Sequence, residues 1–224
     1  YDEEEVLIDF RIIKRDGSLC WISHGCRPIF SQQDGRFLGR RASNRDITIR
    51  KELEEKLQYQ AQCDYLTGIA NRRYFMERAQ EELARSLRKK TPLAILMFDL
   101  DYFKAINDTH GHHVGDLVLQ RVAIVCKEAL RNIDVFGRIG GEEFAVVLPE
   151  TNKTGAIIVA KRLHHVINHS RIIIKQGNLI QFTASFGISI LTDHQGTNLG
   201  SLLQQADKML YQAKENGRNQ IMCI

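Results

Sequence analysis

Residues 93–100 (Leu-Ala-Ile-Leu-Met-Phe-Asp-Leu) form a nearly continuous apolar run, and this run constrains the fold most. Its length fits a strand, and a strand without polar alternation must be covered on both faces. The run ends in Asp99-Leu100-Asp101. Because alternate residues of a strand share a face, we expect Asp99 and Asp101 to project together. Two carboxylates at the end of a buried strand are costly to desolvate, which favours a metal site over a purely structural role.

A second acidic element is predicted at a glycine-rich turn between two apolar stretches, 135–139 and 144–148. The residues of the turn are Gly140, Gly141, Glu142 and Glu143. This pattern predicts a β-hairpin. Taken alone, the turn is equally consistent with an exposed acidic tip. If the hairpin lies in one sheet with the strand that ends at Asp99, the carboxylates form an oxygen-rich site that suits Mg²⁺ or Mn²⁺.

The segments around these strands predict a mixed α/β (α+β) domain. Helical periodicity covers residues 74–88, 114–131, 154–169 and Leu199–Glu215. Further strands are expected at 171–174, 179–191 and 221–224, with a turn at 176–178. This order predicts antiparallel hairpins in a sheet covered by helices. Lys104, Lys214 and Arg218 supply basic partners near the acids, so the residues indicate metal-assisted chemistry on a nucleotide phosphate.

The first fifty residues have a different character. Strand-like stretches at 6–13, 19–23, 26–30 and 37–44 predict an antiparallel meander. So small a sheet needs a partner to be stable. Residues 48–62 predict a helix that Thr48 can cap. One face of this helix carries Ile49, Leu53 and Leu57, so it either packs on its own domain or pairs two chains as a short coiled coil.

Composition narrows the class of protein. Five cysteines without a C-x-x-C pair indicate a reducing, cytoplasmic compartment and argue against a cysteine zinc site. No apolar run approaches the ~18 residues needed to cross a bilayer, so we expect no membrane contact here. A net charge of +4 without a basic-aromatic stripe argues against nucleic-acid binding. The chain opens at Tyr1 without a methionine, so we expect a piece of a longer protein that is anchored, if at all, upstream.

Six motifs follow one another between residues 64 and 224. They are "DYLTGIANRR", "FDLDYFKAIND", "GHHVGD", "RIGGEEFAVVLP", "FTASFGIS" and "ADKMLYQAKENGRN". In this order they resemble a GGDEF-family diguanylate cyclase domain of the GGEEF variant. The resemblance implies a nucleotidyl-cyclase or palm-like fold with a mostly antiparallel central sheet. It also implies that two GTP molecules are joined into cyclic di-GMP with release of two pyrophosphates. Because each chain offers one nucleotide site, it further implies a homodimer.

The resemblance implies roles for the acidic residues. Asp99 and Glu142 would ligate Mg²⁺ or Mn²⁺ through their side chains, and Leu100 through its carbonyl. Glu142 would also help to deprotonate the attacking 3′-hydroxyl. Asp101 and Glu143 would serve as a second ligand or as supporting charge. The glycine pair, Gly140 and Gly141, would leave room for the phosphates.

Substrate contacts are implied in the same way. The phosphate-binding residues would be Lys104, Lys214 and Arg218. Asn107 and Asp116 would read the guanine edge, although Asp116 is also expected in the first turn of a helix, where the helix dipole favours a negative charge. His112 would line the nucleotide pocket or pack within its loop.

A product-inhibition site is implied by Arg131-Asn132-Ile133-Asp134, with Arg162 as a further candidate. Arg131 could instead simply favour a helix C-terminus. Cyclic di-GMP bound there would inhibit the enzyme. A different reading is a catalytically inactive receptor for cyclic di-GMP or GTP. The retained metal acids and glycine pair argue against it.

Upstream, "RIIKRDGSLCWI", "RPIFSQQDGRFLG" and "SNRDITIRKELEEKL" lie within or next to residues 6–50. They resemble the C-terminal part of a PAS sensor domain. The sequence therefore predicts a PAS fragment at 1–47, a helical signalling linker at 48–63 and the GGDEF domain at 64–224.

Overall fold

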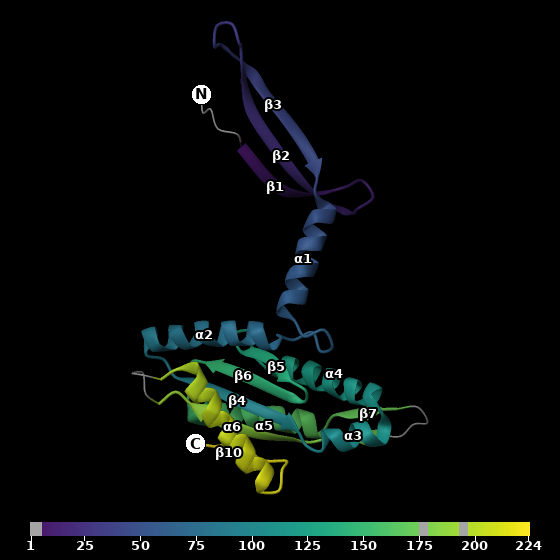
Figure 1. Ribbon diagram of the computed structural model, residues 1–224, viewed down its shortest axis with the longest axis vertical. Coiled ribbons are helices and arrows are strands. Elements are labelled where there is room, and N and C mark those ends of the chain that lie inside the picture. The colour runs from purple at the N-terminus through teal and green to yellow at the C-terminus, as the bar shows by residue number, and fades with distance from the viewer. Residues whose placement is uncertain (1–5, 175–178, 193–196) are drawn as a thin grey trace. The chain divides into compact units, whose positions relative to one another are not determined.

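The apolar run forms β4 (Leu93–Leu100), the middle strand of a five-stranded sheet in the computed structural model (Figure 1). The structure describes residues 6–174, 179–192 and 197–224. They divide into two compact units, Tyr1–Tyr59 and Gln60–Ile224, and the sheet belongs to the second. Every residue of β4 is buried, so the prediction of a strand covered on both faces is confirmed.

The sheet of the second unit is mostly antiparallel, as expected. Its strand order is β10-β9-β4-β6-β5. The other members are β5 (Val135–Gly140), β6 (Glu143–Pro149), β9 (Ala184–Ile190) and β10 (Ile221–Cys223). The edge strand β10 runs parallel to β9, whereas the remaining neighbours pair antiparallel. A separate two-stranded sheet joins β7 (Arg171–Ile173) to β8 (Leu179–Gln181).

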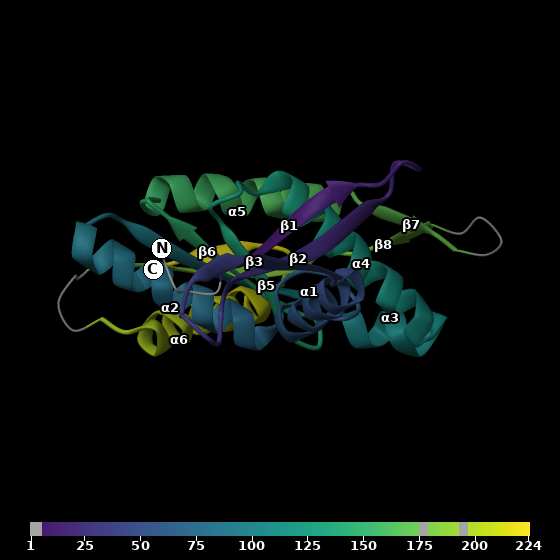
Figure 2. The same ribbon diagram turned by 90° about the horizontal axis from the view of Figure 1, so that it is seen from above.

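Helices cover both faces of this sheet (Figure 2). On one face lie α2 (Arg72–Lys89) and α6 (Leu199–Glu215), and on the other lie α4 (His112–Ala129) and α5 (Lys153–Asn168). Each face has its own apolar core, because successive β4 side chains point to opposite sides. Phe98, for example, stacks on Phe186 with a centroid distance of 4.7 Å within the α4/α5 core. In the described part of the chain, no helix is both long and apolar enough to span a membrane.

Two predictions about this unit need correction. The single strand expected at 179–191 is two strands, β8 and β9. β9 begins at Ala184, which pairs with Leu100 at the end of β4. The segment before it, β8, pairs with β7 instead. A short helix, α3 (Phe103–His110), was not predicted, and α4 begins at His112 rather than at residue 114. The turn expected at 176–178 lies outside the described residues.

The first unit contains a meander of β1 (Val6–Ile13), β2 (Leu19–Phe30) and β3 (Phe37–Asp46) and most of α1 (Thr48–Gln62). The two strands expected at 19–23 and 26–30 are one, because β2 is paired along both edges and Gly25 lies opposite Leu7 and Ser43. The expected capping role of Thr48 is wrong. Its hydroxyl instead accepts a hydrogen bond from the Trp21 amide at 2.9 Å.

Candidate active site

The two aspartates at the end of β4 lie on one face of the sheet but differ in their surroundings. Asp101 is buried, and its carboxylate accepts hydrogen bonds from the hydroxyls of Thr183 and Ser185 at 2.6 Å each. The carboxylate also accepts a hydrogen bond from the backbone N–H of Asn219 at 3.0 Å. Because these three donors satisfy the buried carboxylate, Asp101 has a structural role: it holds the surrounding segments together. They were not predicted, since they come from distant parts of the chain.

Asp99 is buried without such a set of hydroxyl donors. Its Oδ1 lies 3.0 Å from Nζ of Lys214, which α6 brings to the strand end. Burial raises the pKa of Asp99 to about 6, with Lys214 opposing the shift and the charges of Glu142 and Glu143 adding to it. A carboxylate in this position favours a nearby cation.

The glycine-rich turn lies beside Asp99. β4 and β6 pair so that Asp99 faces Glu143, and the Leu100 amide lies 3.4 Å from the Glu142 carbonyl. Gly141 adopts a positive φ of 44°, which closes the turn between β5 and β6. The predicted hairpin is confirmed, and the residues expected to ligate a metal, Asp99, Leu100 and Glu142, are adjacent in space.

These residues fit a hard divalent cation. Mg²⁺ is commonly held by one or two carboxylates together with substrate phosphates, and Asp99 and Glu142 offer such a pair. Within residues 6–174, 179–192 and 197–224, no three His, Cys, Asp or Glu side chains are grouped as a complete metal site. The remaining ligands of a bound ion would therefore have to come from backbone, water and substrate.

A buried polar atom lies where α3 meets α4. The Oδ1 atom of Asn107 is buried there and has no hydrogen-bond partner within the protein. It lies against Gly115, where a Cβ atom would collide with the side chains of Asn107 and Phe103. Asp116 is exposed on α4 and lies past the first turn rather than in it, so the helix dipole does not explain it. His112 is exposed at the start of α4.

The predicted phosphate-binding cations lie on α3 and around the end of α6. Lys104 is exposed on α3, and Lys214 is part of the last turn of α6. Arg218 follows α6, and its guanidinium lies 4.7 Å from the ring centroid of Tyr102, between β4 and α3. Tyr102, which sequence reasoning missed, therefore joins the strand end to the segment after α6.

Comparison with known proteins identifies the family. The family described as "Diguanylate cyclase, GGDEF domain" matches residues 61–220. The chain belongs to the GGDEF family.

Its relatives include "Diguanylate cyclase A" of Treponema denticola, which is 40% identical over 161 residues, 70% of this chain and 43% of the relative. The crystal structure of the diguanylate cyclase SiaD in complex with its activator SiaC, from Pseudomonas aeruginosa, matches with a TM-score of 0.71 and 34% identity. The match covers 79% of this chain and 66% of SiaD. The coiled coil and GGDEF domain of DgcB from Caulobacter crescentus, in complex with c-di-GMP, match with a TM-score of 0.74 and 26% identity, covering 80% and 93%. The chain spans less than half the length of the curated relatives it matches.

The second predicted site of this GGDEF domain lies at the start of β5. Oδ2 of Asp134 accepts from the Arg131 amide at 2.9 Å, while its Oδ1 is buried without a hydrogen-bond partner. Burial raises the pKa of Asp134, and the charges of Arg131 and Arg162 oppose the shift. Arg162 is exposed on α5. A cavity of about 310 Å³ adjoins the Arg131–Asp134 turn.

Proposed function

We propose that this GGDEF domain is a diguanylate cyclase that joins two GTP molecules into cyclic di-GMP and releases two pyrophosphates. The observation that carries the proposal is the buried Asp99, whose pKa is raised to about 6 beside Glu142 and Glu143, with Lys214 at 3.0 Å. Such an arrangement suits a divalent cation and a polyphosphate.

In this proposal Asp99, the Leu100 carbonyl and Glu142 hold Mg²⁺ or Mn²⁺. When bound, the ion neutralises phosphate charge and orients the nucleotide. Glu142 accepts the proton of the attacking 3′-hydroxyl, and Glu143 contributes supporting charge. We leave Asp101 out of the metal-binding set, because its carboxylate already accepts three hydrogen bonds.

The phosphates are bound by the neighbouring cations. Lys104, Lys214 and Arg218 reach them from α3 and from the end of α6, and Lys104 stabilises charge in the transition state. Gly140 and Gly141 allow the phosphates to approach the backbone, since the space beside each Cα holds no other protein atom within 4 Å of where a Cβ would lie.

Guanine is recognised at the junction of α3 and α4. The buried Oδ1 of Asn107 is an acceptor without a donor, and the N1–H and exocyclic amine of guanine can supply one. Asp116 accepts from the same edge, and His112 borders the base. Adenine offers no such donor pair, which favours GTP.

One domain binds one GTP, so catalysis takes place in a homodimer. Supporting this, α1 exposes Ile49, Leu53 and Leu57 at 73%, 55% and 64%, spaced to form one apolar stripe. We propose that residues 48–63 are a linker helix that pairs with its copy.

In the same proposal, residues 1–47 are the C-terminal part of a PAS sensor domain, and residues 64–224 are the cyclase domain. The free thiols of all five cysteines suit the cytoplasm.

Feedback inhibition follows from the second site. Arg131, Asp134 and Arg162 bind cyclic di-GMP, whose phosphates and guanine edges suit arginine. Arg131→Ala is expected to raise the product concentration for half-maximal inhibition about tenfold or more with turnover retained. An unchanged inhibition curve would discard the site.

The test is incubation of the purified chain with GTP and Mg²⁺, followed by mass spectrometry of the nucleotides. Cyclic di-GMP and pyrophosphate are expected, and a chelator should abolish both. Glu142→Gln should lower kcat about 100-fold or more. Glu128→Gln, at an exposed glutamate of α4, is the matched control. Product formation that is equal in the two variants would refute the role of Glu142.

A further inference from the structure

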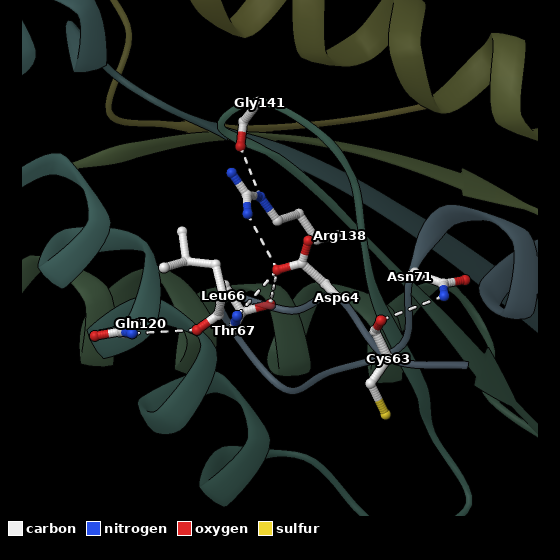
Figure 3. A network of polar contacts seen from close by, with 8 residues as sticks. All are labelled: Cys63, Asp64, Leu66, Thr67, Asn71, Gln120, Arg138 and Gly141. Atoms are coloured by element: carbon white, nitrogen blue, oxygen red, sulfur yellow. Dashed lines mark hydrogen bonds and ion pairs between the residues drawn. The ribbon is translucent and has the colours of Figure 1, made fainter. Parts of the chain in front are cut away.

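The loop that follows α1 contains a motif, Asp64-Tyr65-Leu66-Thr67, to which the proposed chemistry assigns no role. Figure 3 shows where it lies: Asp64 points to Arg138, and Arg138 points on to Gly141. The two segments are 74 residues apart in the sequence. Their contact therefore connects the start of the GGDEF domain with its glycine-rich turn.

Asp64 is a fixed, charged acceptor. Its Oδ1 accepts from the amide and hydroxyl of Thr67, at 3.0 and 2.6 Å, and lies 3.0 Å from Nη1 of Arg138. Both charged side chains are largely buried, with 13% of Arg138 and 17% of Asp64 exposed. Burial by itself raises the pKa of Asp64, but Thr67 and Arg138 outweigh it and the net pKa is lowered. The pair is therefore charged at neutral pH, where charge-assisted hydrogen bonds are strong.

The other side of the Arg138 guanidinium reaches the turn. Its Nε donates to the Gly141 carbonyl at 2.8 Å, and Gly141 directly precedes Glu142. Pairing between β5 and β6 is irregular at this place, with a register shift between Arg138 and Gly140. The regular ladder therefore constrains this turn less than the rest of the hairpin, and the Arg138–Gly141 hydrogen bond adds a fixed point next to Glu142.

The loop itself is held on three sides. Ala70 forms a bridge with Gly137, and its carbonyl accepts from the Arg138 amide at 2.9 Å. Gln120 of α4 donates to the Leu66 carbonyl at 3.2 Å. The backbone N–H of Asn71 donates a hydrogen bond of 2.8 Å to the carbonyl of Gln62, the last residue of α1. A rigid anchor of this kind gives the Asp64 carboxylate a defined position relative to the sheet.

We propose that Arg138 is a positioning residue for Glu142 and that Asp64 fixes Arg138. Only a planar guanidinium can donate to Asp64 through Nη1 and to Gly141 through Nε at once, so lysine cannot replace it. The proposal rests on the proposed cyclase function, since it assigns Glu142 to the reacting groups. It links the residues just after α1 to the geometry of the catalytic turn.

The kinetic test compares Arg138→Ala, Arg138→Lys and Asp64→Ala in the 224-residue chain. We expect kcat with GTP to fall about 30- to 100-fold in both Arg138 variants and about tenfold in Asp64→Ala, because small displacements of reacting groups are costly. KM should stay within about threefold, since substrate contacts remain. The double variant Asp64→Ala/Arg138→Ala should be no slower than Arg138→Ala by more than about twofold, because the residues act in series. Arg88→Ala, an exposed arginine of α2, is the control.

A second readout does not depend on activity. Amide hydrogen exchange over residues 139–145 should be about tenfold faster in Arg138→Ala and Asp64→Ala than in the wild type or Arg88→Ala. If kcat is unchanged well below the melting temperature, or Arg138→Lys restores it fully, the positioning role is overturned. If the wild type makes no cyclic di-GMP, the proposed function fails, but hydrogen exchange still decides whether Arg138 orders the turn. An exchange rate over residues 139–145 that is unchanged in the variants overturns that inference.

Discussion

The two units use their apolar residues in different ways. Among residues 6–59, Cys20 and Ile47 are the buried ones, while Leu7 and Ile13 of β1 are 69% and 75% exposed. In the second unit, by contrast, all of β4 is buried between helices on both faces. The second unit therefore has its own core, whereas the three-stranded sheet of the first presents apolar side chains that need a cover to contribute to stability.

The difference teaches where the stability of the chain resides and where substitutions should matter. Tight packing makes the second unit sensitive to one added methyl group or one lost hydrogen bond. The open sheet of the first unit can absorb similar changes. Two experiments matched between the units test this contrast, and two further ones examine the second unit by itself.

The largest expected effect comes from a glycine in each unit. A Cβ atom at Gly187 of β9 would collide with the backbone of Ala206 and Leu210 in α6, and no rotamer change relieves a backbone collision. At Gly25 of β2 the nearest atom is the Ser43 hydroxyl oxygen at 3.3 Å, which can rotate away. We expect Gly187→Ala to cost about 3 kcal/mol or more and Gly25→Ala less than about 1 kcal/mol in urea denaturation. Equal costs would contradict the contrast.

Next in size is the loss of a buried carboxylate. Asp101→Asn places an amide NH₂ among the donors of Thr183, Ser185 and Asn219, so we expect a loss of about 2–3 kcal/mol in the free energy of unfolding. The control is Asp9→Asn in the first unit, where the exposed ion pairs with Arg50 and Lys51 should contribute little. A comparable loss in both variants would mean that burial does not set the cost.

Removal of the first unit should change the second only slightly. A chain of residues 60–224 keeps the Ala61 and Gln62 carbonyls that accept from Asn71. We expect it to unfold cooperatively, with a melting temperature within about 3 °C of the 224-residue chain, since a 1 kcal/mol change shifts a domain of this size by about 2–4 °C. A non-cooperative transition would show that the core of the second unit is not sufficient.

The smallest effect concerns acid stability. The pKa of Asp64 in the folded chain lies below its ordinary value of 3.8, so its contribution to stability is complete above that value and is lost as the pH falls through the lower folded pKa. Asp64→Asn should therefore be less stable than wild type by a constant amount above about pH 5, and the difference should narrow below about pH 4. Urea denaturation at pH 3, 4, 5 and 7 measures the difference in free energy of unfolding between the two proteins. A difference that widens on acidification would contradict the lowered pKa of Asp64.

Sequence reasoning was most accurate where the periodicity was strong. β4 and α6 were predicted to the residue. Errors fell where pairing overrides local preference, as at Gly25 of β2 and at the break before β9. The proximity of Asp99 and Glu142 was expected on the condition that the hairpin and the acidic strand share one sheet, and the pairing of β4 with β6 meets that condition.

The sequence by itself determined the family, the acidic strand end and the glycine-rich turn, since these depend on local pattern and residue type. Only the tertiary structure decided which acid is saturated with hydrogen bonds and which is left to attract a cation. Asp99 and Asp101 are nearly equivalent in sequence, yet Thr183, Ser185 and Asn219 reach one and Lys214 reaches the other. The same holds for Asp64 and Arg138, because the energy of a buried charge depends on neighbours that only folding brings together.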